Sequence, residues 1–478
     1  MNPHSYGSAA ILMLLLLGGC ATFSEDGGTR AVHETVRERG IVQDIAPVRN
    51  AADANRVRDT VRDLLTQSLT ADAAVQIALL NNRGLQASYA ELGIAEAELV
   101  QAGRLRNPGF SFERIRGGGV VEIDRTFMFD VLGLLTMPIR TDLERRRFEL
   151  AQGRLALQIL QVAADTRRAW INAVAAQQTV AYAEQVQAAA EAAAELARRM
   201  ALAGNFSKLD RAREQSFYAD AATQLARARL AAAAARERLN RLLGLWGDDL
   251  RYTLPARLPD LPQTAQLPEL ISDPAQLEQR AMALRLDVQG AMKQAENIAA
   301  AMGLVRATGF IDVLEVGYRH DTATGEPRQT GYAIELRLPI FDFGSAKVAR
   351  AEQIYLQAVH RAADIAVRAR SEVREAHGAW RTAFDLARHY RDEVIPLRTL
   401  IGEETLLRYN GMLASVFDLL AESRRQSTAV IAAITTQRDF WIADTALRLA
   451  ITGQSSGAAD ALAAAAPGAD GQAAAPAH

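Results

Sequence analysis

The sequence predicts a mainly α-helical fold with a smaller β part, made of two similar halves. Three observations lead to this prediction. Apolar residues recur at alternating steps of three and four across much of 343–452, the heptad pattern of long coiled helices. Shorter segments alternate apolar and polar residues, which indicates strands. The same order of elements occurs twice, at a shift of about 200 residues.

Residues 1–19 have the features of a signal peptide, because a short apolar run ends just before Cys20, the only cysteine. The stretch Leu17-Gly18-Gly19-Cys20 resembles a bacterial lipobox. That resemblance implies a covalent lipid on Cys20, no other cofactor, and transfer of the mature protein to the outer membrane. The alternative is an ordinary cleavage site with a chance cysteine. Residues 20–70 are polar and are expected to form an extended, lipidated N-terminal arm.

The first half of the chain is expected to span 71–247. It should hold a helix, then a β-hairpin over 107–131, then a helical hairpin over 141–246. In the β-hairpin, three consecutive glycines mark the turn between two alternating segments. The heptad stripe resumes past the β-hairpin and breaks at Ala203-Gly204-Asn205, where the chain is expected to turn back.

A proline-rich linker, 248–274, leads to the second half, 275–452. This half is expected to repeat the order of the first, with a helix, a β-hairpin over 307–340 and a helical hairpin over 343–452. The tail, 453–478, is rich in Ala, Gly and Pro and is predicted to be disordered.

Two features are expected inside the second helical hairpin. Pro396 removes one backbone hydrogen bond and should bend the outgoing helix. Asn410 and Gly411 suit a left-handed helix end, so the turn is expected there. The first turn aligns with it from Gly204 onto Gly411, with one residue inserted in the second turn.

Four strands per chain cannot close a barrel, and an open sheet edge in a bilayer leaves backbone groups without hydrogen bonds. If the strands lie in a membrane, several chains must therefore share one barrel, and three chains would supply twelve strands. Strands of about ten residues fit the thickness of an outer membrane. A water-soluble sheet with one buried face shows the same alternation and is the alternative.

Taken together, these features resemble the TolC family of outer-membrane efflux proteins, in its lipoprotein branch, over about residues 70–452. The resemblance implies a homotrimer with a shared twelve-stranded β-barrel and a trimeric α-barrel of long coiled helical hairpins. The residues that carry it are the strand-to-helix step Leu336-Arg337-Leu338-Pro339-Ile340-Phe341-Asp342-Phe343-Gly344, and the turn Tyr409-Asn410-Gly411 followed by Val416-Phe417-Asp418-Leu419-Leu420.

The resemblance also implies a function and a location. The protein would lie in the bacterial outer membrane, anchored by lipid and extending into the periplasm. There it would form the exit duct of a tripartite efflux system, joined to a periplasmic adaptor protein and an inner-membrane pump of the resistance-nodulation-division type. A duct for type I protein secretion is an alternative. A lipid-anchored periplasmic helical scaffold is another, although a scaffold does not need the strand pairs.

In this family a periplasmic gate closes the tunnel at the helical turns. The matching residues here are Asp418, Asp210 and Tyr409, with Tyr409 linked to Asp210 and Asp418 lining the constriction. Three symmetry-related carboxylates would repel one another, so raised pKa values or bound counterions are expected. Ala421 stands where a second carboxylate is usual. The alternative is that Asp210 and Asp418 only stabilise the first turns of their helices.

The grooves between the helical tips are the expected contact site for the adaptor. Small or apolar positions there suit a partner's helical hairpin: Gly204, Phe206, Gly411, Leu413 and Ser415.

Composition gives no sign of other functions. The net charge of −2 does not indicate a nucleic-acid partner. The seven histidines are spread over different elements and form no metal-ligand motif. The sequence contains no phosphate loop or nucleophile elbow. An enzyme is therefore not expected.

Overall fold

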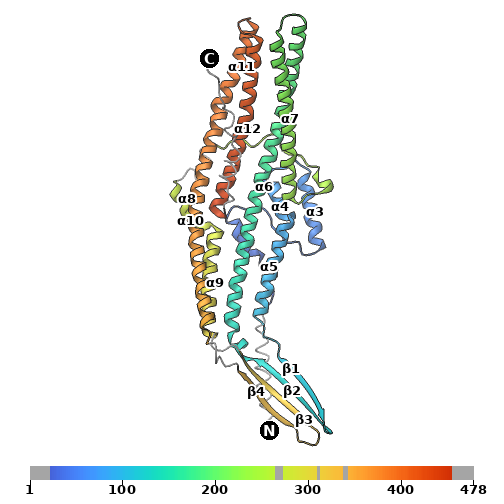
Figure 1. The fold of residues 1–478 in the computed structure, drawn as a ribbon, viewed down its shortest axis with the longest axis vertical. Helices are drawn as coiled ribbons and strands as arrows, with labels where there is room; N and C mark the ends of the chain where they lie inside the picture. The colour runs from blue at the N-terminus through green and yellow to red at the C-terminus, as the bar shows by residue number, and fades with distance from the viewer. Residues whose placement is uncertain (1–21, 264–272, 309–312, 337–342, 455–478) are drawn as a thin grey trace. The chain divides into compact units, whose positions relative to one another are not determined.

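A computed structural model describes residues 22–263, 273–308, 313–336 and 343–454. Cys20, the predicted signal peptide, most of the predicted tail and the strand-to-helix step at 337–342 lie outside the described residues. The described chain is mainly helical with a single four-stranded sheet, which confirms the predicted fold class (Figure 1). No helix in these ranges is long and apolar enough to cross a bilayer.

The chain divides into two compact units. The first takes the described residues of 1–35, 88–156 and 287–366, and the second those of 36–87, 157–286 and 367–478. The sheet belongs to the first unit, and both helical turns belong to the second.

The sheet is antiparallel, in the order β1-β2-β3-β4. Each half of the chain contributes one hairpin, and the central pair, β2 with β3, joins the two halves. Strands β1 and β4 are left at the edges. The bounds are β1 (Gly109–Gly117), β2 (Val120–Asp130), β3 (Leu314–Ala323) and β4 (Gln329–Leu336).

One face of the sheet carries a row of aromatic side chains, one from each strand. In the strand register, Phe110 lies opposite Phe127, Phe127 opposite Tyr318, and Tyr318 opposite Tyr332. All four are exposed in the single chain. Elsewhere in the sheet, Arg319 forms ion pairs with Asp124 and Asp321, at 2.9 and 2.7 Å. The alternation of the sequence thus produces an aromatic row and a charged cluster.

The first helical hairpin is made of α6 (Val131–Leu202) and α7 (Lys208–Leu243). Helix α6 begins ten residues earlier than the predicted hairpin, directly after β2. The reason is that Asp130 caps it, because its Oδ1 accepts a hydrogen bond of 2.6 Å from the Gly133 N–H. Pro138 lies inside the helix, where it costs one backbone hydrogen bond.

The second helical hairpin is made of α10 (Ser345–His389), α11 (Ile395–Asn410) and α12 (Val416–Thr452). A π-helical turn, Tyr390–Val394, separates α10 from α11. It ends two residues before Pro396, which lacks a backbone N–H and would clash with the carbonyl of the preceding turn. A π-helical turn therefore directly precedes Pro396, while the bend expected there stays a prediction.

Both shorter helices that were expected to be continuous are interrupted once. The first half has α4 (Ala71–Asn81) and α5 (Arg83–Ala102), and the second has α8 (Pro274–Leu284) and α9 (Leu286–Thr308). The breaks, at Asn82 and Arg285, share the extended ψ angles 118° and 121°.

These two breaks aim a polar side chain at carbonyl groups of neighbouring elements. Asn82 donates a hydrogen bond of 2.9 Å to the Leu242 carbonyl. Arg285, 1% exposed, donates to the Ala450 carbonyl at 3.2 Å and pairs with Glu372 at 2.7 Å. A periodicity of apolar residues does not reveal such breaks, because the pattern continues across them.

The N-terminal arm is not extended throughout, contrary to the prediction. It contains α2 (Thr29–Arg37) and α3 (Ala51–Leu65). Helix α3 is capped by Asn50, whose side chain accepts a hydrogen bond from the Asp53 N–H at 2.9 Å. Val61 of α3 is buried in the same core cluster as Trp170. Tertiary packing thus stabilises a helix that the polar sequence of this segment does not predict.

The core of the second unit lies around two tryptophans, one from each half. Trp170 donates a hydrogen bond of 2.7 Å from its ring nitrogen to the Leu69 carbonyl. Trp380 packs on Phe384 and Phe440. The first described part of the linker also joins this core, through buried side chains at Tyr252, Leu254 and Leu258, after a short 3-10 turn, η1 (Gly247–Leu250).

Candidate functional site

The first helical turn follows α6 and reverses the chain within five residues. Gly204 has a φ of +79°, and two backbone hydrogen bonds close the helix end, from Gly204 N to Ala201 O and from Asn205 N to Met200 O. This is the Schellman arrangement, which needs one left-handed residue. Ser207 then caps α7, since its Oγ accepts a hydrogen bond of 3.0 Å from the Asp210 N–H.

The second turn follows α11 and has the same backbone hydrogen bonds, from Met412 N to Tyr409 O and from Leu413 N to Arg408 O. Its left-handed residue is Met412, with a φ of +57°, whereas Gly411 has a φ of −81°. The predicted left-handed end at Asn410 and Gly411 is therefore wrong. A glycine was expected to mark this position, but here a methionine adopts the conformation that disfavours a Cβ.

The two turns match residue for residue. Gly204 takes the place of Met412, Ser207 that of Ser415, and Asp210 that of Asp418, all at one constant offset along the chain. The predicted inserted residue is absent, because matching glycine to glycine shifted the alignment by one position. The two halves thus use one turn design with different residues at the strained position.

Asp210 and Asp418 act as helix-capping partners within one chain. Asp418 and Ser415 form a complete capping box: the Ser415 N–H donates to Asp418 Oδ2 at 3.0 Å, and the Asp418 N–H donates to Ser415 Oγ at 3.2 Å. Asp210 accepts a hydrogen bond of 2.6 Å from the Ser207 hydroxyl and lies 3.3 Å from Arg213. Both carboxylates are therefore held at the start of their helices.

The Ser415 hydroxyl, and after it the Ser415 backbone N–H, holds the pKa of Asp418 below its ordinary value of 3.8. This direction is opposite to the one expected where three such carboxylates meet. Within a single chain, local hydrogen bonding is the dominant influence.

The structure does not join Tyr409 to Asp210. Among the hydrogen bonds of the described residues in a single chain, none connects this pair, although both lie at the turns. The turns are joined instead by two phenylalanines: the rings of Phe206 and Phe417 stack with centroids 5.0 Å apart. Phe206, predicted as an adaptor contact, therefore also packs within its own chain.

The tip of the second turn is strongly exposed. Met412 is 94% exposed and Leu413 is 83% exposed. Gly204, Gly411 and Ser415 are exposed as well. Two large apolar side chains at one turn give a surface that a partner could bury.

Two buried carboxylates below the turns were not predicted. Glu214 on α7 and Glu422 on α12 are each 3% exposed. Glu214 pairs with Arg424 at 2.7 Å, and Glu422 with Arg398 and Arg425 at 3.3 and 3.2 Å. Arg424 also lies over the Phe217 ring, 4.2 Å from its centroid.

A sequence signal for these groups was available. In both halves the capping serine is followed by Asp at the third position and Glu at the seventh, as Ser207, Asp210, Glu214 and as Ser415, Asp418, Glu422. The repeated Glu lies one helical turn beyond the Asp, on the same face. The described residues contain no group of three His, Cys, Asp or Glu that could hold a metal ion.

Comparison with solved structures gives consistent matches along most of the chain. A membrane protein from Pseudomonas aeruginosa is 19% identical with a TM-score of 0.67, over 82% of this chain and 93% of that one. CusC is 16% identical with a TM-score of 0.66, over 81% and 93%. The outer membrane channel CmeC of Campylobacter jejuni is 15% identical with a TM-score of 0.64, over 88% and 92%.

The chain has the fold of the TolC family. The fold expected from the sequence resemblance is thereby confirmed. No family model and no curated protein matches the sequence.

Proposed function

We propose that the protein is the outer-membrane channel of a tripartite efflux system and that it assembles as a homotrimer. Proteins of the same fold include OprN, CmeC and MtrE, each described as an outer-membrane channel. In the proposed system, three chains form an exit duct for a periplasmic adaptor and an inner-membrane pump of the resistance-nodulation-division type.

The observation that carries this proposal is the four-stranded sheet. It has two open edges, β1 and β4, and an exposed row of four aromatic side chains. Open edges carry unpaired backbone groups, which a membrane does not tolerate, and pairing β1 of one copy with β4 of the next removes them. An aromatic row facing outward is typical of membrane-embedded barrels, where it lies at the lipid–water interface.

The lipid anchor on Cys20 and the outer-membrane location belong to the same proposal. The lipobox-like sequence supports the anchor. A lipid at the N-terminus and a shared barrel would both hold the assembly at one membrane, so neither has to act alone.

The two helical turns are proposed as the periplasmic gate and the adaptor contact. Asp418 would line the constriction, with Asp210 and Tyr409 nearby. Gly204, Gly411, Leu413 and Ser415 would contact the adaptor, together with the exposed edge of Phe206. The exposed apolar pair at 412 and 413 supports a partner surface there.

Cross-linking tests the assembly. Ser111 of β1 is changed to Cys together with Gly331, Ala333 or Glu335 of β4, in the full-length lipidated protein. At least one pair is expected to give cross-linked dimers and trimers but nothing larger, since the ring closes at three. A control pair, Ser111 with Glu352 of α10, should give none.

Conductance tests the channel itself. The purified protein is added to a planar lipid bilayer, and stepwise ion currents are expected. A protein that remains monomeric in detergent, or that gives no currents while the cross-linked trimer is present, would contradict the channel.

A further inference from the structure

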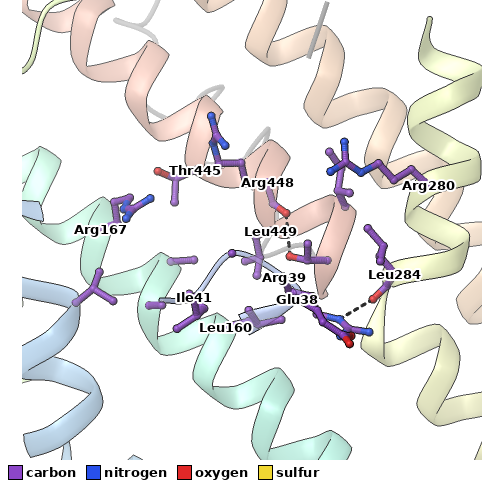
Figure 2. Close-up of a pocket in the computed structure, with 16 residues that line it drawn as sticks. Glu38, Arg39, Ile41, Leu160, Arg167, Arg280, Leu284, Thr445, Arg448 and Leu449 are labelled. Carbon is purple, nitrogen blue, oxygen red and sulfur yellow. Dashed lines mark hydrogen bonds and ion pairs between the residues drawn. The ribbon is translucent and has the colours of Figure 1, made fainter. Parts of the chain in front are cut away.

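A cavity of about 320 Å³ lies within the second unit, between the segment that follows α2 and the helices α4, α6, α8 and α12 (Figure 2). This volume falls in the usual range for small-molecule sites, about 300–1,000 Å³. None of its lining residues belongs to the sheet or to the helical turns. The proposed channel function therefore does not account for it.

One part of the cavity wall is apolar. Six aliphatic side chains from five segments contribute to it: Ile41, Val75, Leu160, Leu284, Leu449 and Ile451. Such a wall favours an aliphatic group, because burying apolar surface is worth about 25 cal/mol per Å².

The rest of the wall is rich in positive charge. Arg39, Arg167, Arg280 and Arg448 line the cavity, and Figure 2 shows these four side chains on different sides of it. Glu38 is the only carboxylate among the lining residues. Arg39, Arg167 and Arg448 each have a carboxylate nearby, Glu38, Asp72 and Asp444 in turn, so the cavity offers an anion further guanidinium N–H donors rather than uncompensated charge.

The contacts of these arginines still allow an anion to bind. Arg167 uses one nitrogen on Asp72 at 2.6 Å, and Arg448 uses one on Asp444 at 2.8 Å. A guanidinium group carries five N–H donors, so each of these two has donors beyond its ion pair. The donors of a guanidinium also match the geometry of a carboxylate or phosphate.

Arg39 is the most buried of the four arginines. Its side chain is 5% exposed, and its Nε donates a hydrogen bond of 2.9 Å to the Leu284 carbonyl. Its Nη1 is 3.5 Å from Glu38. Burial lowers the pKa of the Arg39 guanidinium from its ordinary value, so the folded protein holds this charge at a cost in free energy.

We propose that this cavity binds an anionic amphiphile, a ligand with one carboxylate or phosphate head and a short aliphatic chain. The head lies among Arg167, Arg280 and Arg448. The chain packs on Leu160 and Leu449. The inference rests on the cavity alone and does not depend on the proposed channel activity.

Equilibrium dialysis of the purified full chain in lipid nanodiscs tests this proposal. The probes are radiolabelled octanoate and octyl phosphate, with octanol as the uncharged probe of the same length. At least one of the two anions should bind saturably, at one site per chain, and about tenfold or more tighter than octanol. The relative affinities of octanoate and octyl phosphate identify which acidic head the site prefers.

Substitutions locate the site. Arg280→Gln and Arg448→Gln, both at exposed positions, should each weaken anion binding about five- to tenfold. Ala164→Leu fills the cavity and should abolish binding of all three probes. Arg374→Gln is the matched control, because Arg374 is an exposed arginine paired with Glu278 outside the cavity. Circular dichroism checks that each variant is folded.

Several results would overturn the proposal. Octanol binding as tightly as the anions would show a purely apolar site. Affinity unchanged in both arginine variants would place binding elsewhere. Absence of saturable binding to the wild-type assembly would mean that the cavity is covered, for instance by a second copy of the chain.

Discussion

Glu214 and Arg424 form an ion pair of 2.7 Å between α7 and α12, the return helices of the two hairpins. Glu214 is almost fully buried, whereas about a third of the Arg424 side chain is exposed. The pair therefore connects the two halves of the chain just below their turns. Removing the cation alone would leave a buried carboxylate without its counterion, which is costly.

Arg424→Gln is expected to destabilise the helical part by about 2 kcal/mol, less than a fully buried pair would lose because Arg424 is partly exposed. Urea titration followed by circular dichroism measures this change. Adding Glu214→Gln to the variant should restore part of the stability. Arg229→Gln is the control, since its ion pair with Glu184 is exposed on both sides and should contribute less than about 1 kcal/mol. Equal effects of Arg424→Gln and Arg229→Gln would contradict the interpretation.

Met412→Gly is expected to stabilise the second turn by about 1 kcal/mol, because glycine adopts a φ of +57° without steric strain. The converse change, Gly204→Ala, should destabilise the first turn by a similar amount, since Gly204 has a φ of +79°. Gly411→Ala serves as the control, with its ordinary φ of −81°. Thermal melting of the three variants gives the comparison. A Met412→Gly protein that melts earlier than the wild type would show that the methionine side chain contributes more than the strain costs.

Replacing Asp418 by Asn separates capping from a constriction role. The pKa of Asp418 is lowered in the single chain, so the carboxylate adds stability above its ordinary pKa of 3.8, and this stability is lost as the pH falls through the lowered folded-state pKa. Asp418→Asn should therefore be less stable than the wild type at pH 7 and equally stable at the acid end. Melting curves recorded from pH 7 down to pH values below 3.8 measure the difference in stability.

A gain in stability for Asp418→Asn at pH 7 would be equally informative. If three Asp418 carboxylates meet closely at an axis of the assembly, their repulsion outweighs the capping bonds, and Asp418→Asn becomes the more stable protein at pH 7. Ser415→Ala gives the reference, because it removes the cap at a cost of about 1 kcal/mol and leaves the carboxylate in place.

Arg285→Met tests the interruption between α8 and α9. The buried guanidinium donates to the Ala450 carbonyl and pairs with Glu372, so losing it leaves both groups without this partner. A loss of about 3 kcal/mol is expected in urea titration. Arg374→Met, which breaks only the exposed pair between Arg374 of α10 and Glu278 of α8, should cost far less. If the two variants were alike, the helix break would have no dependence on the arginine.

The long helices and the strands were predictable because their patterns extend over many residues. A heptad stripe such as the one through Trp380 and Tyr390 admits few alternatives. The alternation around Phe127 and Phe129 is equally regular. The pairing of β2 with β3 was not predictable from local pattern, since partners such as Asp124 and Asp321 lie in different halves of the chain.

The details of the site were harder to predict because they depend on single residues. Glycine is the usual left-handed residue, so the sequence favours Gly411 over Met412, and the predicted alignment of the turns shifts with it. Asn82 and Arg285 interrupt helices whose apolar periodicity continues unbroken. The link expected between Tyr409 and Asp210 came from the family resemblance. The buried Glu214 needed a tertiary partner, which spacing alone does not identify.

The central strand pair has a consequence for the timing of biosynthesis. Val120–Asp130 finds its partner only in a segment on the order of 200 residues later, and a ribosome adds about 5–20 residues per second. During synthesis, β2 therefore lacks its β3 partner for roughly 10–40 seconds. A strand with an unpaired edge can pair with a strand of another chain, so chaperone binding is expected to protect this segment during that interval.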